Sequence, residues 1–452
     1  MRELKVPKSI LAASVALLAL SPGVASAAVE GEVAYILNSF SFILNGALVM
    51  WMAAGFAMLE AGLVRKKNTA TICLKNIALY SVSGLTFYLV GYNLMYLDVT
   101  GYIGSFSLFW APDDTAALAG TFEDGGYSAS SDWFFQMVFV ATAASIVSGA
   151  LAERIKLWSF LGFVFLLTAI IYPISGGWQW QGSGWLTELG FIDFAGSSIV
   201  HSVGGWAALV AAILVGPRIG KFVDGKVFPI PGHNQVLATL GVFILWLGWF
   251  GFNGGSQLAW GGADAIGASN VVLITNLAAA AGGLGALVTT WIWYGKPHLA
   301  QTLNGALAGL VSITAGCGNM SSEGAVLAGL IGGILVVFSI EFIEKKLKID
   351  DAIGAASVHG VVGVWGTLVI GLWGIDGDKG IGLFNGGGAS QLGTQAIGAF
   401  AYAAWAIVLS FIILYTLKKT IGLRVSKEVE EKGLDLAEHG TIAYPGKRDR
   451  GE

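Results

Sequence analysis

The sequence predicts an all-α polytopic membrane protein whose chain crosses the bilayer eleven times. Hydrophobic residues make up 55% of the 452 residues and charged residues only 12%, with a mean hydropathy of +0.71. A soluble domain carries roughly 25% charged residues. Apolar runs long enough to cross ~30 Å of hydrocarbon recur along the whole chain. They begin near Val33, Thr71, Trp133, Leu157, Phe194, Val236, Asn270, Leu299, Ala325, Ala352 and Thr394.

Glycine is unusually common, at 65 of 452 residues. The ordinary share is ~7%. Pairs four residues apart, such as Gly305 with Gly309 and Gly329 with Gly333, let membrane helices approach backbone to backbone. We therefore expect closely packed helices in this part of the chain.

The first residues read as a secretory signal peptide. Basic Arg2, Lys5 and Lys8 precede a short apolar run, and Ala25-Ser26-Ala27 follows it. The alternative is an uncleaved first span, but the run is only about eleven residues long, short of the ~20 that a span needs. We expect cleavage near Ala27, which leaves a transmembrane domain over residues 28–416.

Basic residues set the orientation. With the mature N-terminus outside, the inside loops hold nearly all lysines and arginines between the spans, whereas the long outside segment 98–132 holds none. The C-terminus is then inside, and residues 417–452 form a polar cytosolic tail. Its small apolar face of Leu434, Leu436 and Ala437 could dock onto the inner loops.

Two segments of the chain share one polar pattern. In "DFAGSSIVHSVGG" Asp193 precedes His201 by eight residues, and in "DAIGAASVHGVVG" Asp351 precedes His359 by the same spacing. One segment runs inward and the other outward, and eight residues carry each histidine ~12 Å along its helix, close to the bilayer midplane. This arrangement predicts an inverted five-plus-five repeat with one extra helix.

The buried histidines call for a function or for a partner. Neutral imidazoles that face each other can satisfy one another and keep ring nitrogens free for a passing small molecule. Asp193 and Asp351 suit helix N-termini, as caps alone or as members of a proton relay. Zinc sites take three or four protein ligands. The other histidines fall in inside loops or the tail, so we expect no metal.

Other classes of function lack support in the sequence. No nucleophile elbow or phosphate-binding loop is visible, so we expect neither an enzyme nor a cofactor. The net charge of −4 supplies no basic face for nucleic acid.

Several motifs resemble the ammonium transporter family, the Amt and Mep proteins with their Rhesus relatives. They are "GALAERI" at 149–155, "DFAGSSIVH" at 193–201, "GWFGFNGGS" at 248–256, "DDAIGAASVHG" at 350–360 and "GLDLAEHG" at 433–440. The resemblance covers almost the whole mature length. It implies an eleven-helix inverted repeat, usually trimeric, with a narrow apolar pore through each subunit of a cell membrane protein.

The resemblance also assigns residues. His201 and His359 match the twin pore histidines, and Phe139 and Phe252 match the two stacked pore phenylalanines. An outer ammonium recruitment site is matched by these residues: Ser256, Asp193, Trp249 and a tryptophan. Trp180 is the choice for that tryptophan and Trp178 the reserve, because the local spacing is one residue longer than the family pattern.

The leading hypothesis is a transporter that recruits ammonium, with methylammonium as an analogue, deprotonates it and conducts ammonia. A cation–π site with a hydroxyl acceptor suits ammonium. The proton could stay outside or cross by a separate relay. The alternative is an ammonium sensor that signals through its tail, which holds no kinase or cyclase domain. A neutral-gas channel of the Rhesus kind is disfavoured. The resemblance further implies a homotrimer and a PII-type signal protein at the cytosolic face.

Overall fold

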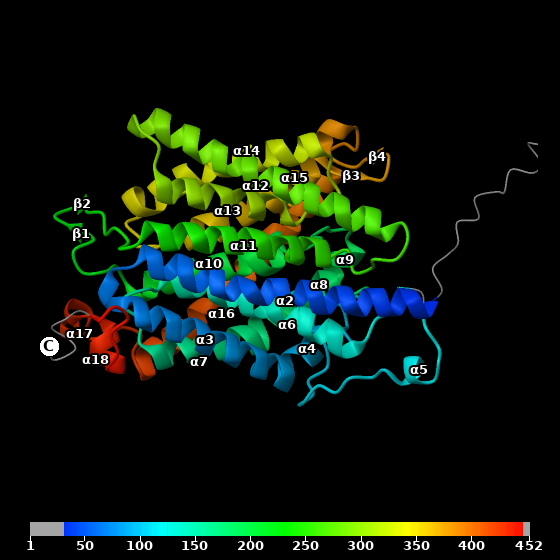
Figure 1. Cartoon of the computed structure of the whole chain (residues 1–452), viewed down its shortest axis with the longest axis horizontal. Helices are drawn as coiled ribbons and strands as arrows, with labels where there is room; N and C mark the ends of the chain where they lie inside the picture. Colours follow the sequence, from blue (N-terminus) through cyan, green and yellow to red (C-terminus); the bar gives the residue numbers. More distant parts are fainter. Residues whose placement is uncertain (1–30, 124, 446–452) are drawn as a thin grey trace, which may run out of the picture.

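The protein is a bundle of long helices lying side by side (Figure 1). The structure, a computed structural model, describes residues 31–123 and 125–445. The predicted signal peptide lies outside the described residues and stays a prediction. The long elements are α2 (Gly31–Leu63), α3 (Thr69–Thr86) with η2 (Phe87–Gly91) and α4 (Tyr92–Tyr96), α6 (Ala129–Ala150), α7 (Leu157–Leu166) with η3 (Leu167–Ile171) and α8 (Tyr172–Trp180), η4 (Ser197–Ser202) with α10 (Val203–Val215), α11 (Gln235–Gly255), α12 (Asp264–Tyr294), α13 (Leu299–Thr314), α14 (Ser322–Glu341) with η5 (Phe342–Lys346), η6 (Ala356–Val361) with α15 (Val362–Trp373), and α16 (Ser390–Thr420).

Ten apolar helical segments of the described chain are long enough to cross a membrane, and α13 is a shorter apolar helix. With α13 counted, the described residues contain the eleven helices that the sequence predicts. Each begins within six residues of its predicted start: α7 and α13 begin at Leu157 and Leu299 as predicted, and α12 begins at Asp264, before the predicted Asn270. Because α13 is buried without a break from Leu303 to Thr314, it presents little of its surface to lipid and can be shorter.

Helices α12, α13 and α14 pack through glycine, as the glycine pairs predict. A Cβ on Gly309 would lie 2.2 Å from the carbonyl oxygen of Ala278, and one on Gly333 would lie 2.0 Å from that of Gly282. Neither separation is possible for a real side chain, so the backbones must touch. This close approach gives van der Waals packing where the bilayer offers no hydrophobic drive between helices.

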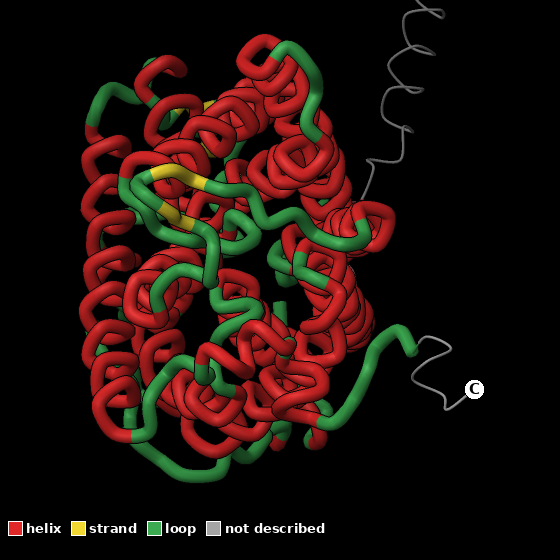
Figure 2. Tube along the Cα trace, turned by 90° about the vertical axis from the view of Figure 1, so that its left-hand side faces the viewer, coloured by secondary structure: helices red, strands yellow, loops and turns green. Residues whose placement is uncertain are grey.

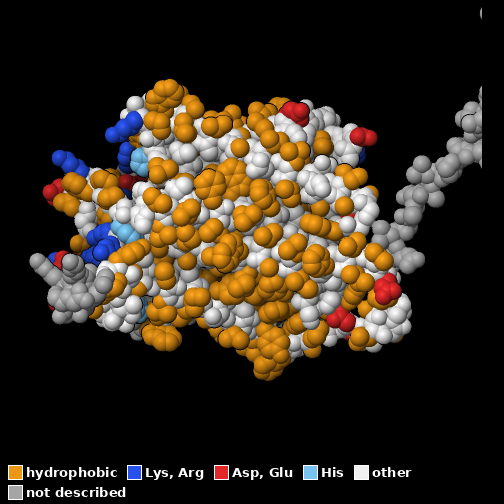
Figure 3. All heavy atoms as spheres, viewed as in Figure 1, with side chains coloured by type: hydrophobic (Ala, Val, Ile, Leu, Met, Phe, Trp, Pro, Cys, Tyr) orange, Lys and Arg blue, Asp and Glu red, His pale blue; other side chains and the backbone are white. Residues whose placement is uncertain are grey.

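The two ends of the bundle differ in charge. Lys and Arg gather at the end that carries the hairpin of β1 (Phe222–Val223) and β2 (Lys226–Val227), whereas acidic side chains dot the opposite end (Figure 3). That opposite end carries α5 (Thr115–Leu118), α9 (Trp185–Glu188), η7 (Leu383–Asn385) and the hairpin of β3 (Ile375–Asp376) and β4 (Lys379–Gly380). We call the two ends the basic end and the outer end. The basic end matches the predicted cytosolic side.

The helices of the tail lie at the basic end (Figure 1), which is the face turned to the viewer in Figure 2. It follows α16, which ends at Thr420, and contains α17 (Lys427–Lys432) and α18 (Leu434–His439). The Asp435 carboxylate accepts hydrogen bonds from the backbone of Ala70 at 2.9 Å and Thr71 at 2.8 Å, so the tail caps the first turn of α3. Leu434 is buried while Leu436 is 48% exposed. Polar capping therefore contributes more to docking than the predicted apolar face.

Candidate functional site

The two predicted histidines meet in the middle of the bundle. Their Nδ1 atoms lie 3.3 Å apart, and their rings are nearly parallel with centroids 5.2 Å apart. His201 lies in η4 and His359 in η6, and both elements are π-helical turns. π-turns inside α-helices often occur at functional sites. The segments can approach because Gly205 faces Gly360, where a Cβ would lie only 2.0 Å from the Gly360 nitrogen.

A column of aromatic rings continues from His201 toward the outer end. The rings of Phe139 and Phe252 stack with centroids 3.9 Å apart, and Phe252 lies 5.3 Å from the His201 ring. Trp249 packs against His201 at 4.8 Å, while its Nε1 donates to Thr314 Oγ1 at 2.8 Å. All of these side chains are buried. The structure thus brings four residues from α6, η4 and α11 into one apolar column.

The geometry separates the two candidate tryptophans. Trp180 meets Phe139 edge to face at 5.9 Å, and its Nε1 donates to the backbone oxygen of Asp193 at 2.9 Å. Trp178 packs instead against Trp405 at 5.2 Å and donates to the backbone oxygen of Tyr102. Of the two, only Trp180 contacts a ring of the aromatic column.

The predicted aspartates act as helix caps. The Asp193 carboxylate accepts four backbone N–H groups, from Gly196 to Ile199, at 2.8 to 3.0 Å. Asp351 accepts two, from Ala355 at 3.0 Å and Ala356 at 2.7 Å. Burial raises the pKa of each to about 6, against these hydrogen bonds. Each helix starts a few residues after its aspartate, because the carboxylate reaches forward to the first free amides.

The remaining predicted residue, Ser256, ends α11 one turn outside Phe252. Its hydroxyl donates to the Phe252 backbone oxygen at 2.9 Å, which leaves the oxygen lone pairs free to accept from a ligand. Two further rings join the column that sequence reasoning did not select. Phe135 lies 4.8 Å from Phe139, and Phe56 lies 6.4 Å from His359 at the opposite side of the pair. Phe135 could have been found, since it precedes Phe139 by one helical turn.

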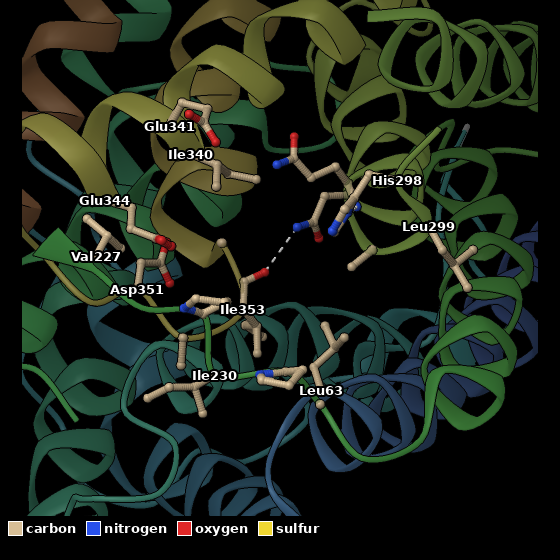
Figure 4. Close-up of a pocket in the computed structure, with 18 of the residues that line it drawn as sticks. Leu63, Val227, Ile230, His298, Leu299, Ile340, Glu341, Glu344, Asp351 and Ile353 are labelled. Carbon is tan, nitrogen blue, oxygen red and sulfur yellow. Dashed lines mark hydrogen bonds between the residues drawn. The ribbon is translucent and has the colours of Figure 1, made fainter. Parts of the chain in front are cut away.

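A hollow of about 740 Å³ opens at the basic end, on the side where Asp351 begins its helix (Figure 4). Leu63, Ile230 and Ile353 line one side, and His298 and Leu299 line another. Asn304 Nδ2 donates to the Ile353 backbone oxygen at 3.1 Å and holds that wall. This hollow could not be predicted from the sequence, because its lining comes from separate stretches of chain between Leu63 and Gly354.

A buried ion network lies beside the hollow. Arg218 donates through Nε and Nη2 to both carboxylate oxygens of Asp350 at 2.8 Å, and through Nη1 to Glu153 at 3.3 Å. Glu153 also pairs with Arg65. Burial alone would raise the pKa of Asp350, but the hydrogen bonds and charge of Arg218 hold it well below its usual value. The network fixes the segment that carries Asp351.

Comparisons with known proteins agree with this geometry. The model of the Ammonium Transporter Family matches residues 40–444. An ammonium transporter Amt2 of Archaeoglobus fulgidus is 43% identical over 89% of this chain and 87% of its own length, and a putative ammonium transporter of Synechocystis is 42% identical over 92% of both. Among solved structures, one titled a sensor Amt protein is 41% identical with a TM-score of 0.83, covering 90% of this chain and 99% of that one. The Saccharomyces cerevisiae Mep2 structure is 28% identical with a TM-score of 0.80, covering 92% and 94%. The chain is therefore a multi-pass membrane protein that belongs to the ammonium transporter family.

Proposed function

We propose that this chain recruits ammonium beside Trp180 and Ser256, removes its proton there and conducts ammonia past the two histidines. The observation that carries the proposal is the buried column itself, in which stacked Phe139 and Phe252 lie directly outside the His201 and His359 pair. A bare cation that enters such a column loses several kcal/mol of solvation or more. Neutral ammonia avoids that cost and can exchange hydrogen bonds with the imidazole nitrogens.

Each residue has a distinct part. The Trp180 ring offers a cation–π face, and the Ser256 oxygen accepts one N–H. Asp193 contributes long-range attraction, because its carboxylate is already occupied by backbone amides. His201 Nε2 has no hydrogen-bond partner among the described residues, so it is free to meet ammonia that passes Phe252. Asp351 marks the exit into the hollow at the basic end, where a released ammonia regains a proton from water.

Sealed liposomes that contain the purified protein test this proposal. An ammonium pulse is applied while membrane current and internal pH are recorded. Internal alkalinisation without current means that the proton stays outside, and a transient current means that it crosses by a relay. The double variant His201→Ala, His359→Ala should lose whichever signal the wild type gives. An unchanged signal in that variant contradicts the proposed path.

The two tryptophans supply a matched pair of variants. Trp180→Leu should raise the ammonium concentration that gives half of the maximal signal about tenfold. This shift corresponds to ~1.4 kcal/mol of lost cation attraction. Trp178→Leu removes an equal ring that contacts Trp405 instead of the column and should leave that dependence unchanged. Equal effects of both would show that the choice of Trp180 is wrong.

A sensor is the second candidate, since one similar structure carries that title. In that case ammonium binds without either liposome signal, and the tail changes its contacts. Protease protection of the tail with and without ammonium distinguishes a sensor from a transporter.

We also propose, from the family resemblance, that the protein is a homotrimer and that a PII-type partner binds at the basic end. The mass of the detergent-solubilised protein tests the homotrimer, and co-purification with a PII-type protein tests the partner.

A further inference from the structure

A lone carboxylate is buried near the outer end of the bundle. Asp132 lies in the first turn of α6 and is 6% exposed. The Tyr92 hydroxyl donates to one of its oxygens, and Gln136 Nε2 donates to the other at 3.4 Å. No lysine or arginine of the described residues pairs with it, and the preceding outside segment 98–131 contains neither residue.

An ionised carboxylate is energetically costly to bury at this position without a counter-ion. A buried charge without a counter-ion loses most of its hydration, and proteins usually pair it or hydrogen-bond it fully. An ionised carboxylate can accept about four hydrogen bonds, and Asp132 receives two from side chains. The helix N-terminus adds some stabilisation, but acceptor capacity remains unused. A cation could complete these contacts.

A run of four aromatic rings includes Tyr92, whose hydroxyl contacts the carboxylate. The Tyr92 ring lies 4.8 Å from Tyr96 and 5.0 Å from Trp110, and Trp110 stacks on Trp133 at 5.9 Å. These rings come from α4, from the outside segment and from α6. Rings that flank a carboxylate can offer their faces to a weakly hydrated cation. We call Asp132 with these four rings the Asp132 cage.

A second observation points to a missing ligand. The hydroxyl of Tyr96 is buried and has no hydrogen-bond partner among the described residues. Its ring packs against that of Tyr92, whose hydroxyl donates to Asp132. A phenol oxygen has lone pairs to offer a cation. A ligand that contacts Asp132 as well as this oxygen would supply the missing partner.

We propose that the Asp132 cage binds a small, weakly hydrated monovalent cation of the size of ammonium or potassium. One carboxylate and two phenol oxygens with aromatic walls suit a single charge, whereas calcium needs six to eight oxygens and magnesium a near-ideal octahedron. The inference does not depend on transport, because it concerns binding alone.

The cage is a different place from the proposed recruitment site. The ring contacts and hydrogen bonds of the described residues do not join the cage to Trp180 or Ser256. They lead instead to Phe87, whose ring lies 5.6 Å from that of Tyr92 and 6.3 Å from that of Trp133. A cation in the cage would therefore lie outside the aromatic column.

Thallium is a suitable probe, because it matches potassium and ammonium in size and gives an anomalous X-ray signal. Crystals of the full chain grown in potassium-free, ammonium-free thallium acetate should show a thallium peak beside Asp132. Asp132→Asn keeps the acceptor for Tyr92 but removes the charge, and should remove the peak. Tyr96→Phe keeps the carboxylate and the Tyr92 bond, and should weaken thallium binding several-fold. It serves as the fallback should Asp132→Asn fold poorly.

Competition and a control complete the test. Ammonium or potassium should displace thallium at concentrations about tenfold lower than sodium, and the ratio of the first two shows which cation the cage prefers. Trp180→Ala should leave the peak unchanged. The proposal is wrong if no thallium lies at Asp132, if the peak persists in Asp132→Asn, or if Trp180→Ala abolishes it, since the last result would make the cage part of the recruitment site. None of these results depends on whether the protein conducts ammonia.

Discussion

The two segments that carry the histidines share a spacing and a π-helical turn, yet their surroundings differ. On the outer side Asp193 accepts four backbone amides, and its backbone oxygen receives the Trp180 indole. On the inner side Asp351 accepts two amides and lines the hollow at the basic end. The outer aspartate is sealed into the protein, whereas the inner one lies at an opening.

The difference shows how one repeated pattern serves two purposes. In the proposed mechanism, closure on the outer side keeps water from the aromatic column, so that a hydrated cation meets only Trp180 and Ser256. In the same proposal, the opening on the inner side lets a neutral molecule leave and regain water. The inner segment gains its rigidity from elsewhere, because Asp350 is clamped by Arg218. The outer aspartate supplies its own rigidity.

The largest effect should come from a methyl group placed between the two segments. In Gly205→Ala the new Cβ would lie 2.0 Å from the Gly360 nitrogen and 2.5 Å from its Cα, which are backbone atoms that cannot turn aside. The segments must then separate, at a cost of about 3 kcal/mol or more. The melting temperature in detergent should fall by several degrees, and the liposome signal should be lost.

The same substitution in the facing glycine, Gly360→Ala, is the matched control. A Cβ on Gly360 would come no closer than 3.3 Å to Gly205, a contact that a small shift relieves. Gly360→Ala should therefore cost about 1 kcal/mol or less. If the two variants melt alike, the approach of the segments is not as asymmetric as their contacts indicate.

This pair of glycines also shows which structural features could be predicted from the sequence and which could not. Hydropathy and the spacing of apolar runs predicted the helices, since a bilayer requires long apolar segments whatever their neighbours. The repeated aspartate and histidine predicted that two segments meet in the membrane, because a buried imidazole needs a partner. Which glycine faces which depends on the rotation of two helices whose histidines are 158 residues apart in the chain, and the spacing of residues in the sequence does not contain that rotation.

The candidate site was likewise predicted only in part from the sequence. The resemblance named His201, Phe139 and Phe252, and the structure brings these residues together. It left Trp180 and Trp178 open, because an extra residue in the connecting segment changes the face that each ring occupies. The inner hollow and the Asp132 cage were not predicted, since residues from distant stretches meet there through packing alone.

A smaller loss of stability is expected when the aspartate that caps either helix is replaced by alanine. Asp193→Ala leaves four buried amides without acceptors, and an unsatisfied buried donor costs about 1 to 3 kcal/mol, so a loss of about 2 kcal/mol is expected after local relaxation. Asp351→Ala frees only two amides, beside an opening that water can reach, and should cost about 1 kcal/mol. Thermal unfolding of both variants measures the ratio. Equal losses would show that the inner cap is as sealed as the outer one.

The smallest expected effect is a difference between Asp350 and Asp351 in how each makes the stability depend on pH. The pKa of Asp350 is held below its usual value of 3.8, so its contribution to stability is present above that pH and is lost only as the pH falls through the lower folded value. The pKa of Asp351 is raised by burial to about 6, so the folded state takes up a proton before the unfolded state does, and its contribution grows as the pH falls from 7 toward 4. Melting temperatures at pH 7 and pH 5 should therefore differ less in Asp351→Asn than in the wild type, while Asp350→Asn lowers both by similar amounts. If Asp351→Asn leaves the pH difference unchanged, then Asp351 is already solvated like a surface carboxylate, and the contrast between the sealed and the open aspartate is wider than burial indicates.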